Sequence, residues 1–389
     1  MTTANAVHGW ADPDFAGCLD AFRDNVAGGG ELGAACAIYR HGKPVLDAWG
    51  GIADRRTGTP WTRDTAVPVF SVTKGIAALC VLALVERGLI DLDRPVSAYW
   101  PEFGSEGKDR VTVREALAHR AGVPVIGGPV DRAQLVDPIG MAARLAAEKP
   151  LFTPGSAHAY HAITIGWITS ELTRRVTGES IGPWLRHHVA GPRSLNIAIG
   201  RTDADTSPVA TVDVPPEHDT PDIDPNDLMA RPISMNGLIV PRISGVAALV
   251  NDPAIRRAEL AGANAMVDAA SLARLYAATL DPVDGERLLS AATVADACTI
   301  MSTGDQWGGM PGPTWGAGLM LPGGVQPMLG DGSYGHDGMG GSLAFAHAPS
   351  GISFAYIRNR AGRPGVVDPL VYRVVTRLAD TLGLPLPRL

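Results

Sequence analysis

The spacing of hydrophobic positions along the chain predicts where its helices and strands lie. Apolar residues recur every three or four positions in 13–27, 162–176 and 369–382, which predicts amphipathic helices. Two apolar runs, 34–40 and 44–50, are separated by the turn His41-Gly42-Lys43, and this pattern predicts a β-hairpin. Residues 74–87 are apolar on nearly every side, so they predict a buried helix that ends before Gly88.

Shorter patterns fill in the rest of the chain. Residues 112–119, 139–147 and 181–188 predict short helices, and 314–321, 342–348 and 352–358 predict strands. Strands and helices therefore lie at both ends of the sequence, with mostly helices between them. We expect an α/β (α+β) fold: an antiparallel sheet flanked by helices, built from 1–91 and 290–389, with 92–289 as a mainly helical insertion.

Composition narrows the functional classes. Of the 389 residues, 46% are hydrophobic and 19% are charged, and the formal net charge is −7. A chain of this kind forms a large core, and its acidic balance argues against a nucleic-acid partner. No apolar run approaches the ~20 residues of a membrane-spanning helix. The N-terminus has no signal-peptide pattern, so the expected compartment is the cytoplasm.

Residues 202–227 differ from the rest because they hold seven Asp, one Glu and five Pro but no Lys or Arg. We expect them to form a solvated acidic loop. The four cysteines show no metal-ligand spacing, so neither a metal site nor a cofactor is expected. The sequence carries no signal for an oligomeric state.

The strongest candidate for chemistry is Ser71-Val72-Thr73-Lys74 at the start of the buried helix. Residues three apart lie on the same face of a helix, so the Ser71 hydroxyl and the Lys74 amine can approach each other. A serine becomes a nucleophile when a base takes its proton, and burial makes lysine a base by lowering its pKa. Only four residues of the chain are lysines, so a lysine here is an uncommon choice.

Two later segments give this motif a context: 154–162, where Tyr160 follows a Pro-Gly turn, and the glycine-rich 334–341, which we expect to precede a strand. The three motifs in this order resemble the serine β-lactamase and penicillin-binding superfamily. Within it, the chain is most similar to the class C branch and its family VIII carboxylesterases, from about residue 15 to residue 385.

The resemblance implies a β-lactamase-like fold and a role for each matching residue. Ser71 matches the acylated nucleophile, Lys74 its base, and Tyr160 the tyrosine that shares the proton with the lysine. His336-Asp337-Gly338 stands where the β-lactamases have Lys-Thr-Gly and implies substrate contacts. The backbone N–H groups of Ser71 and Met339 would form an oxyanion hole.

Two departures from the family pattern bear on the substrate. Ala162 replaces the asparagine of the second motif, and His336 and Asp337 replace a lysine and a threonine. A penicillin carboxylate needs a fixed cation, whereas histidine is mostly neutral at pH 7 and Asp337 is negative. The expected function is therefore a serine carboxylesterase acting on neutral short-chain esters as small-molecule substrates.

Other functions stay open at this level. An acyltransferase, or an amide or β-lactam hydrolase, would use the same acyl-enzyme, and a catalytically silent binding or assembly protein could share the fold. Gly178-Glu179-Ser180-Ile181-Gly182 also matches the GxSxG motif of α/β-hydrolases. That motif needs a strand before its serine, but the pattern here predicts a helix, so we expect Ser180 to cap the next helix.

Overall fold

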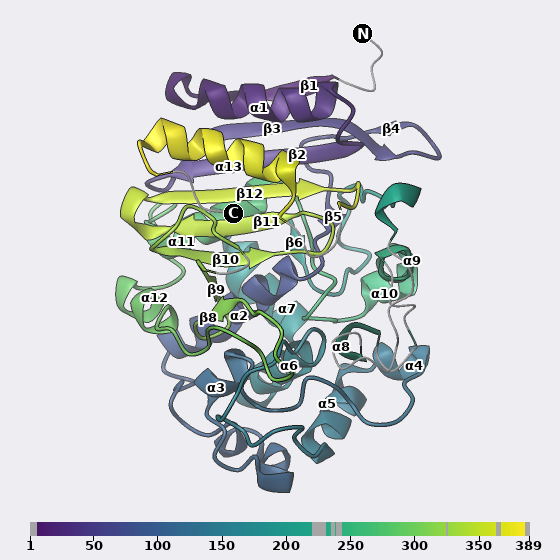
Figure 1. Cartoon of the computed structure of the whole chain (residues 1–389), viewed down its shortest axis with the longest axis vertical. Coiled ribbons are helices and arrows are strands. Elements are labelled where there is room, and N and C mark those ends of the chain that lie inside the picture. The colour runs from purple at the N-terminus through teal and green to yellow at the C-terminus, as the bar shows by residue number, and fades with distance from the viewer. Residues whose placement is uncertain are drawn as a thin grey trace.

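The structure is a computed structural model that describes residues 6–219, 231–234, 238, 243–323, 326–362 and 367–385. Its central element is an antiparallel sheet of nine strands within these ranges (Figure 1). The strand order is β1-β3-β2-β12-β11-β10-β9-β8, with β4 beside β3. The strands are β1 (Val7–Ala11), β2 (Gly33–Arg40), β3 (Lys43–Asp54), β4 (Thr59–Pro60), β8 (Thr314–Trp315), β9 (Met320–Leu321), β10 (Ser333–Asp337), β11 (Leu343–His347) and β12 (Ile352–Arg358).

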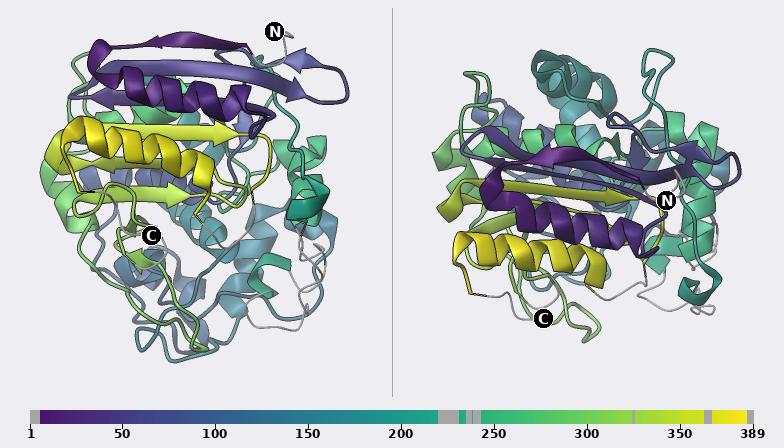
Figure 2. Two further views of the ribbon diagram at one scale, coloured as in Figure 1. Left: turned by 45° about the horizontal axis from the view of Figure 1, so that its top comes forward. Right: turned by 90° about the horizontal axis from the view of Figure 1, so that it is seen from above.

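Both faces of this sheet are covered. Helices α1 (Ala16–Ala27) and α13 (Pro369–Leu382) lie side by side on one face (Figure 2), and α11 (Ala269–Leu280) packs on the other. In β2 the buried residues 35, 37 and 39 belong to one apolar cluster and 34, 36 and 38 to the other. Because successive side chains point to opposite faces, β2 needs apolar residues at nearly every position, which is the run seen in the sequence.

The other helices, from residue 72 to residue 297, lie below or beside the sheet in Figure 1. A small antiparallel sheet of β5 (Val67–Pro68), β7 (Met266–Val267) and β6 (Ile197–Ala198) lies in this region. The helices are α2 (Val72–Glu86), α3 (Val113–Leu117), α4 (Arg132–Leu135), α5 (Pro138–Ala147), α6 (Thr164–Thr177), α7 (Ile181–Leu185), α8 (Arg231–Ser234), α9 (Ile243–Asn251), α10 (Pro253–Arg257) and α12 (Ala291–Ala297).

Helix α2 is the buried helix that the sequence predicts. It packs against α6 and α7 and against strand β10, so no face of it meets solvent until its last turn. Gly88, with a φ of 69°, follows its C-terminus, as expected for a chain that leaves a helix in the left-handed conformation. The hairpin β2–β3, α2 and α13 confirm the predicted α/β class with an antiparallel sheet flanked by helices. The domain boundaries near residues 91 and 290 stay a prediction.

One expectation about strands was wrong, and a second was incomplete. Residues 314–321 form two short paired strands rather than one, because the chain reverses at Gly318, whose φ is 79°. The glycine-rich segment 334–341 precedes strand β11, as predicted, but its first residues also belong to a strand, β10, which pairs with β9 and β11. His336 and Asp337 therefore lie at the carboxyl end of a strand.

The acidic segment is only partly the solvated loop that we expected. Residues 220–227 lie outside the described residues, but 202–219 are anchored to the rest of the molecule. Ala210 is fully buried, and Val209 and Asp213 form isolated bridges to other segments. Acidic side chains of this part pair with arginines elsewhere, as Asp205 does with Arg186 at 3.2 Å. Much of its negative charge is therefore neutralised locally.

Candidate active site

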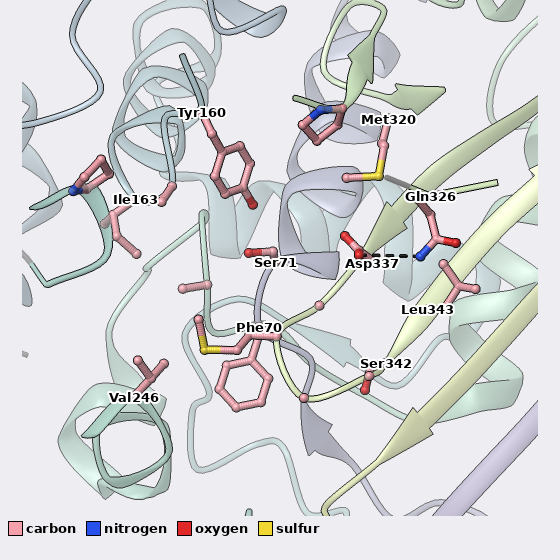
Figure 3. Close-up of a pocket in the computed structure, with 18 of the residues that line it drawn as sticks. Phe70, Ser71, Tyr160, Ile163, Val246, Met320, Gln326, Asp337, Ser342 and Leu343 are labelled. Atoms are coloured by element: carbon pink, nitrogen blue, oxygen red, sulfur yellow. Dashed lines mark hydrogen bonds between the residues drawn. The ribbon is translucent and has the colours of Figure 1, made fainter. Parts of the chain in front are cut away.

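Ser71 lies at the start of α2, in a cleft between the sheet and the helical region (Figure 3). The preceding Phe70 has a φ of 48°, a left-handed conformation that a non-glycine residue adopts only at some cost. This sharp change of direction joins β5 to α2. It leaves the Ser71 side chain facing the cleft rather than closing the helix end, since it makes no capping hydrogen bond.

Lys74 lies one helical turn further on and points back to Ser71. Its Nζ is 2.9 Å from Ser71 Oγ and donates a hydrogen bond to Gly262 O at 2.7 Å. The side chain is buried, and burial lowers its pKa from 10.5 to about 7, with Asp337 acting in the opposite direction. A lysine with such a pKa is partly neutral at pH 7 and can accept a proton.

Gly262 was not predicted as a site residue. In the family pattern an asparagine stands at the position of Ala162, and the backbone carbonyl of Gly262 provides the lysine with a second polar contact. A Cβ at Gly262 would lie 2.9 Å from Ile163 O, and a Cβ at Gly166 would lie 2.3 Å from Gly262 N. Glycine at both positions therefore permits the close backbone approach that brings this carbonyl to Lys74.

Tyr160 completes the predicted trio. Its hydroxyl points towards Ser71 (Figure 3), and its ring lies 4.8 Å from Lys74 Nζ. Burial raises the pKa of Tyr160, so its hydroxyl keeps its proton at pH 7. The structure thus brings together Ser71, Lys74 and Tyr160 from segments far apart in the sequence.

A set of buried rings fixes the orientation of Tyr160. Trp315 stacks on it at 5.7 Å with an interplanar angle of 12°, and His119 lies edge-on to Trp315 at 4.4 Å. His119 Nδ1 accepts the backbone N–H of His161, and burial lowers the pKa of His119. A neutral imidazole with these contacts has a structural role, because it holds the ring stack and the backbone next to Tyr160 in place. Trp315 has no local motif that could have marked it in advance.

The third motif ends at Gly338, where β10 meets the start of α2. A Cβ at Gly338 would lie 2.4 Å from Val69 O, so only glycine permits this approach. Met339 follows and lines the cleft beside Ser71. Within the described part of the chain, neither the Ser71 N–H nor the Met339 N–H has a hydrogen-bond acceptor. Two free donors at the mouth of a buried helix are suited to hold a developing oxyanion.

His336 is not placed as we expected of a residue that contacts substrate. Its ring is fully buried, packs 5.3 Å from Trp315, and is not among the described residues that line the cleft. Along a strand successive side chains alternate, so His336 faces inward whereas Asp337 faces the cleft. Burial lowers the pKa of His336, which leaves it neutral at pH 7.

The rival serine, Ser180, begins α7 after a helix rather than a strand. Our expectation that its own side chain caps α7 was wrong. The Ser180 hydroxyl donates to Glu259 Oε1 at 2.8 Å, and Glu259 Oε2 accepts the Gly182 N–H at 2.9 Å. The carboxylate of Glu259 thus acts as the cap, and Ser180 is not among the described residues that line the cleft.

The cleft has a volume of about 320 Å³ and mostly apolar walls. It contains two carboxylates, Asp337 and Asp368, and no Lys or Arg among the described residues that line it. In the same described part of the chain, no cluster of three or more metal-ligating side chains is found. The described helices also include none that is long and apolar enough to cross a membrane.

Comparisons with known proteins identify the family. The family model described as Beta-lactamase matches residues 20–376, so the chain belongs to this family. The Esterase/beta-lactamase LipL of Mycobacterium tuberculosis (strain ATCC 25618 / H37Rv) is 34% identical, over 94% of this chain and 84% of LipL.

Solved structures extend the match to nearly the whole fold. A family VIII carboxylesterase superposes with a TM-score of 0.86 at 31% identity, covering 97% of this chain and 100% of that chain. A penicillin-binding protein homologue from Caulobacter crescentus superposes with a TM-score of 0.85 at 33% identity, over 97% and 100% of the two chains.

Proposed function

We propose that the protein is a serine carboxylesterase that hydrolyses neutral short-chain esters through an acyl-enzyme on Ser71. One observation carries the proposal: a buried lysine with a pKa of about 7 lies 2.9 Å from the hydroxyl of a serine that faces the cleft. The names of the carboxylesterase and of LipL add independent support for ester substrates.

In the acylation step, neutral Lys74 takes the proton of Ser71 as Oγ forms a bond to the ester carbonyl carbon. The N–H groups of Ser71 and Met339 donate to the oxyanion. When the intermediate collapses, the bond to the alcohol oxygen breaks. Tyr160 donates its proton to that oxygen and regains one from Lys74, which returns the lysine to its neutral form.

Deacylation repeats this sequence with water as the nucleophile. Lys74, through Tyr160, removes a proton from a water molecule as its oxygen attacks the acyl carbon. The bond to Ser71 Oγ then breaks, the oxygen of Ser71 takes the proton back, and the carboxylic acid leaves. Over the two steps the alcohol gains one proton and Ser71 regains one from water, so Lys74 and Tyr160 end in the protonation states in which they began.

The cleft supports the substrate class. A volume of about 320 Å³ is near the lower end of the roughly 300–1,000 Å³ of small-molecule sites, which favours short acyl chains. An anion such as a penicillin would meet two carboxylates and no cationic side chain in the described walls. Its carboxylate would lose the charge-assisted hydrogen bonds that make such substrates bind.

The test is labelling and turnover with matched serine variants. A fluorophosphonate should add one adduct to Ser71 by mass spectrometry, and p-nitrophenyl esters should be hydrolysed fastest at short chain lengths. Ser71→Ala should abolish both, whereas Ser180→Ala should keep both. Labelling of Ser180 with full activity of Ser71→Ala would refute the proposal.

A further inference from the structure

Asp337 has a place in the cleft that its role in the family pattern does not explain. It ends β10, and its side chain is 38% exposed towards the cavity. Figure 3 shows Asp337 on one side of Ser71 with Gln326 beside it, and Ile163 and Val246 on the other side. One end of the substrate site is therefore acidic and the opposite end is apolar.

Asp337 forms no ion pair with a Lys or Arg of the described residues. Its carboxylate accepts a hydrogen bond from the Gln326 amide at 3.5 Å and lies 3.6 Å from the imidazole of His336, which is neutral. The second carboxylate of the cleft differs, because Asp368 pairs with Arg358 and accepts the N–H of Leu370.

We propose that Asp337 is a specificity-determining residue that selects esters carrying a positively charged group, such as an ammonium, close to the scissile bond. The inference rests on the proposed esterase function and extends its substrate class from neutral esters to cationic ones, which it expects to be preferred. A carboxylate between apolar walls attracts a cation more strongly than one in bulk water does. Phe70 and Tyr160 line the same cleft, and aromatic faces attract quaternary ammonium groups.

Another role for Asp337 is open to the same experiment. The charge of Asp337 raises the pKa of Lys74. In this alternative role Asp337 does not contact the substrate and acts solely by favouring the protonated form of Lys74. That role changes the hydrolysis of every ester alike. Recognition of a cation changes only the preference between a charged ester and its uncharged isostere, so the ratio of the two rates separates the roles.

The experiment compares kcat/KM within two isosteric pairs. Acetylthiocholine and 3,3-dimethylbutyl thioacetate carry trimethylammonium or tert-butyl on the leaving group. The p-nitrophenyl esters of 4-(trimethylammonio)butanoic acid and 5,5-dimethylhexanoic acid carry them on the acyl group. Asp337→Asn should lower the ratio of cationic to neutral kcat/KM about tenfold for one pair, and high salt should lower it in the wild type.

Two variants serve as controls. Asp337→Glu keeps the charge and should retain most of the ratio, and Asp109→Asn removes an exposed charge outside the cleft and should leave the ratio unchanged. An unchanged ratio in Asp337→Asn for both pairs would overturn the inference while leaving the esterase intact.

Absence of Ser71-dependent hydrolysis of all four esters would refute the esterase proposal instead. Calorimetry then tests Asp337 without turnover, with hexanoylcholine titrated into Ser71→Ala. Binding at least about tenfold tighter than to the variant that also carries Asp337→Asn supports cation recognition. Equal binding by the two variants overturns it.

Discussion

Replacing Lys74 by methionine should inactivate the protein and yet stabilise it at neutral pH. Burial lowers the pKa of Lys74 from 10.5 to about 7, so the folded chain holds an ammonium group that its surroundings disfavour. A shift of this size corresponds to roughly 5 kcal/mol between the folded and unfolded states. Methionine has a similar length and no charge, so it removes this penalty but leaves Gly262 O without its donor, which costs about 1–3 kcal/mol.

The lowered pKa of Lys74 also determines how the difference in unfolding free energy between the wild type and Lys74→Met changes with pH. Between pH 7 and pH 10.5 the unfolded chain binds the lysine proton and the folded chain does not, so the wild type gains stability as pH rises. The gain approaches ~1.4 kcal/mol per pH unit within this window, and the stability is lowest below pH 7. The advantage of Lys74→Met should therefore be largest at pH 6–7 and disappear towards pH 10.

Urea unfolding of the wild type and Lys74→Met, at pH values from 6 to 10, measures the difference directly because the contributions of all other groups cancel. Lys43→Met replaces an exposed lysine and serves as the control, with a pH-independent difference. In the wild type, kcat/KM should rise with pH through an apparent pKa of about 7. A difference in unfolding free energy that stays constant from pH 6 to 10 would refute the desolvation of Lys74, and with it the general-base role.

Four further substitutions test other parts of the structure. Ser180→Ala should leave kcat within about twofold, whereas Glu259→Ala should lower the unfolding free energy by about 1 kcal/mol through loss of the α7 cap, as urea titration will show. Gly262→Ala should lower kcat at least about tenfold with a shifted pH profile, since the added Cβ displaces the carbonyl that holds Lys74; a normal profile would contradict this role. Asp337→Thr should improve kcat/KM for a chromogenic cephalosporin relative to a neutral ester by roughly 2 kcal/mol, and an equal change for both would show that this carboxylate does not meet the anion.

The sequence predicted correctly those elements whose ends are determined by neighbouring residues, such as caps and turns. Helix α13 begins and ends at the predicted residues because Asp368 caps it and Gly383, with a φ of 65°, follows it. The β2–β3 hairpin follows from two apolar runs and a turn that contains Gly42. Ser71, Lys74 and Tyr160 were found because each lies in a short motif with a characteristic spacing.

Residues that act through tertiary contacts could not be found in this way. Gly262 reaches Lys74 through its backbone carbonyl, a group that every residue has, so no side chain marks it. Trp315 supports Tyr160 from a strand far along the chain. The burial of His336 depends on which face of β10 meets α2, and a segment without alternating apolar residues does not reveal that. The N-cap residue of α7 is Ser180, but the Gly182 N–H donates to the carboxylate of Glu259, which is distant in the sequence.

The sheet order has a consequence for how the protein is made. Strand β2 is hydrogen-bonded on one side to β3 and on the other to β12, and residue 40 pairs with residue 352. Ribosomes add about 5–20 residues per second, so the emerging hairpin has an unpaired, apolar edge for roughly 15–60 seconds. Such edges are templates for aggregation. Nascent chains of this protein should therefore depend on holding chaperones, and the nucleophile near the front of the chain stays inactive until the last strands have been synthesised.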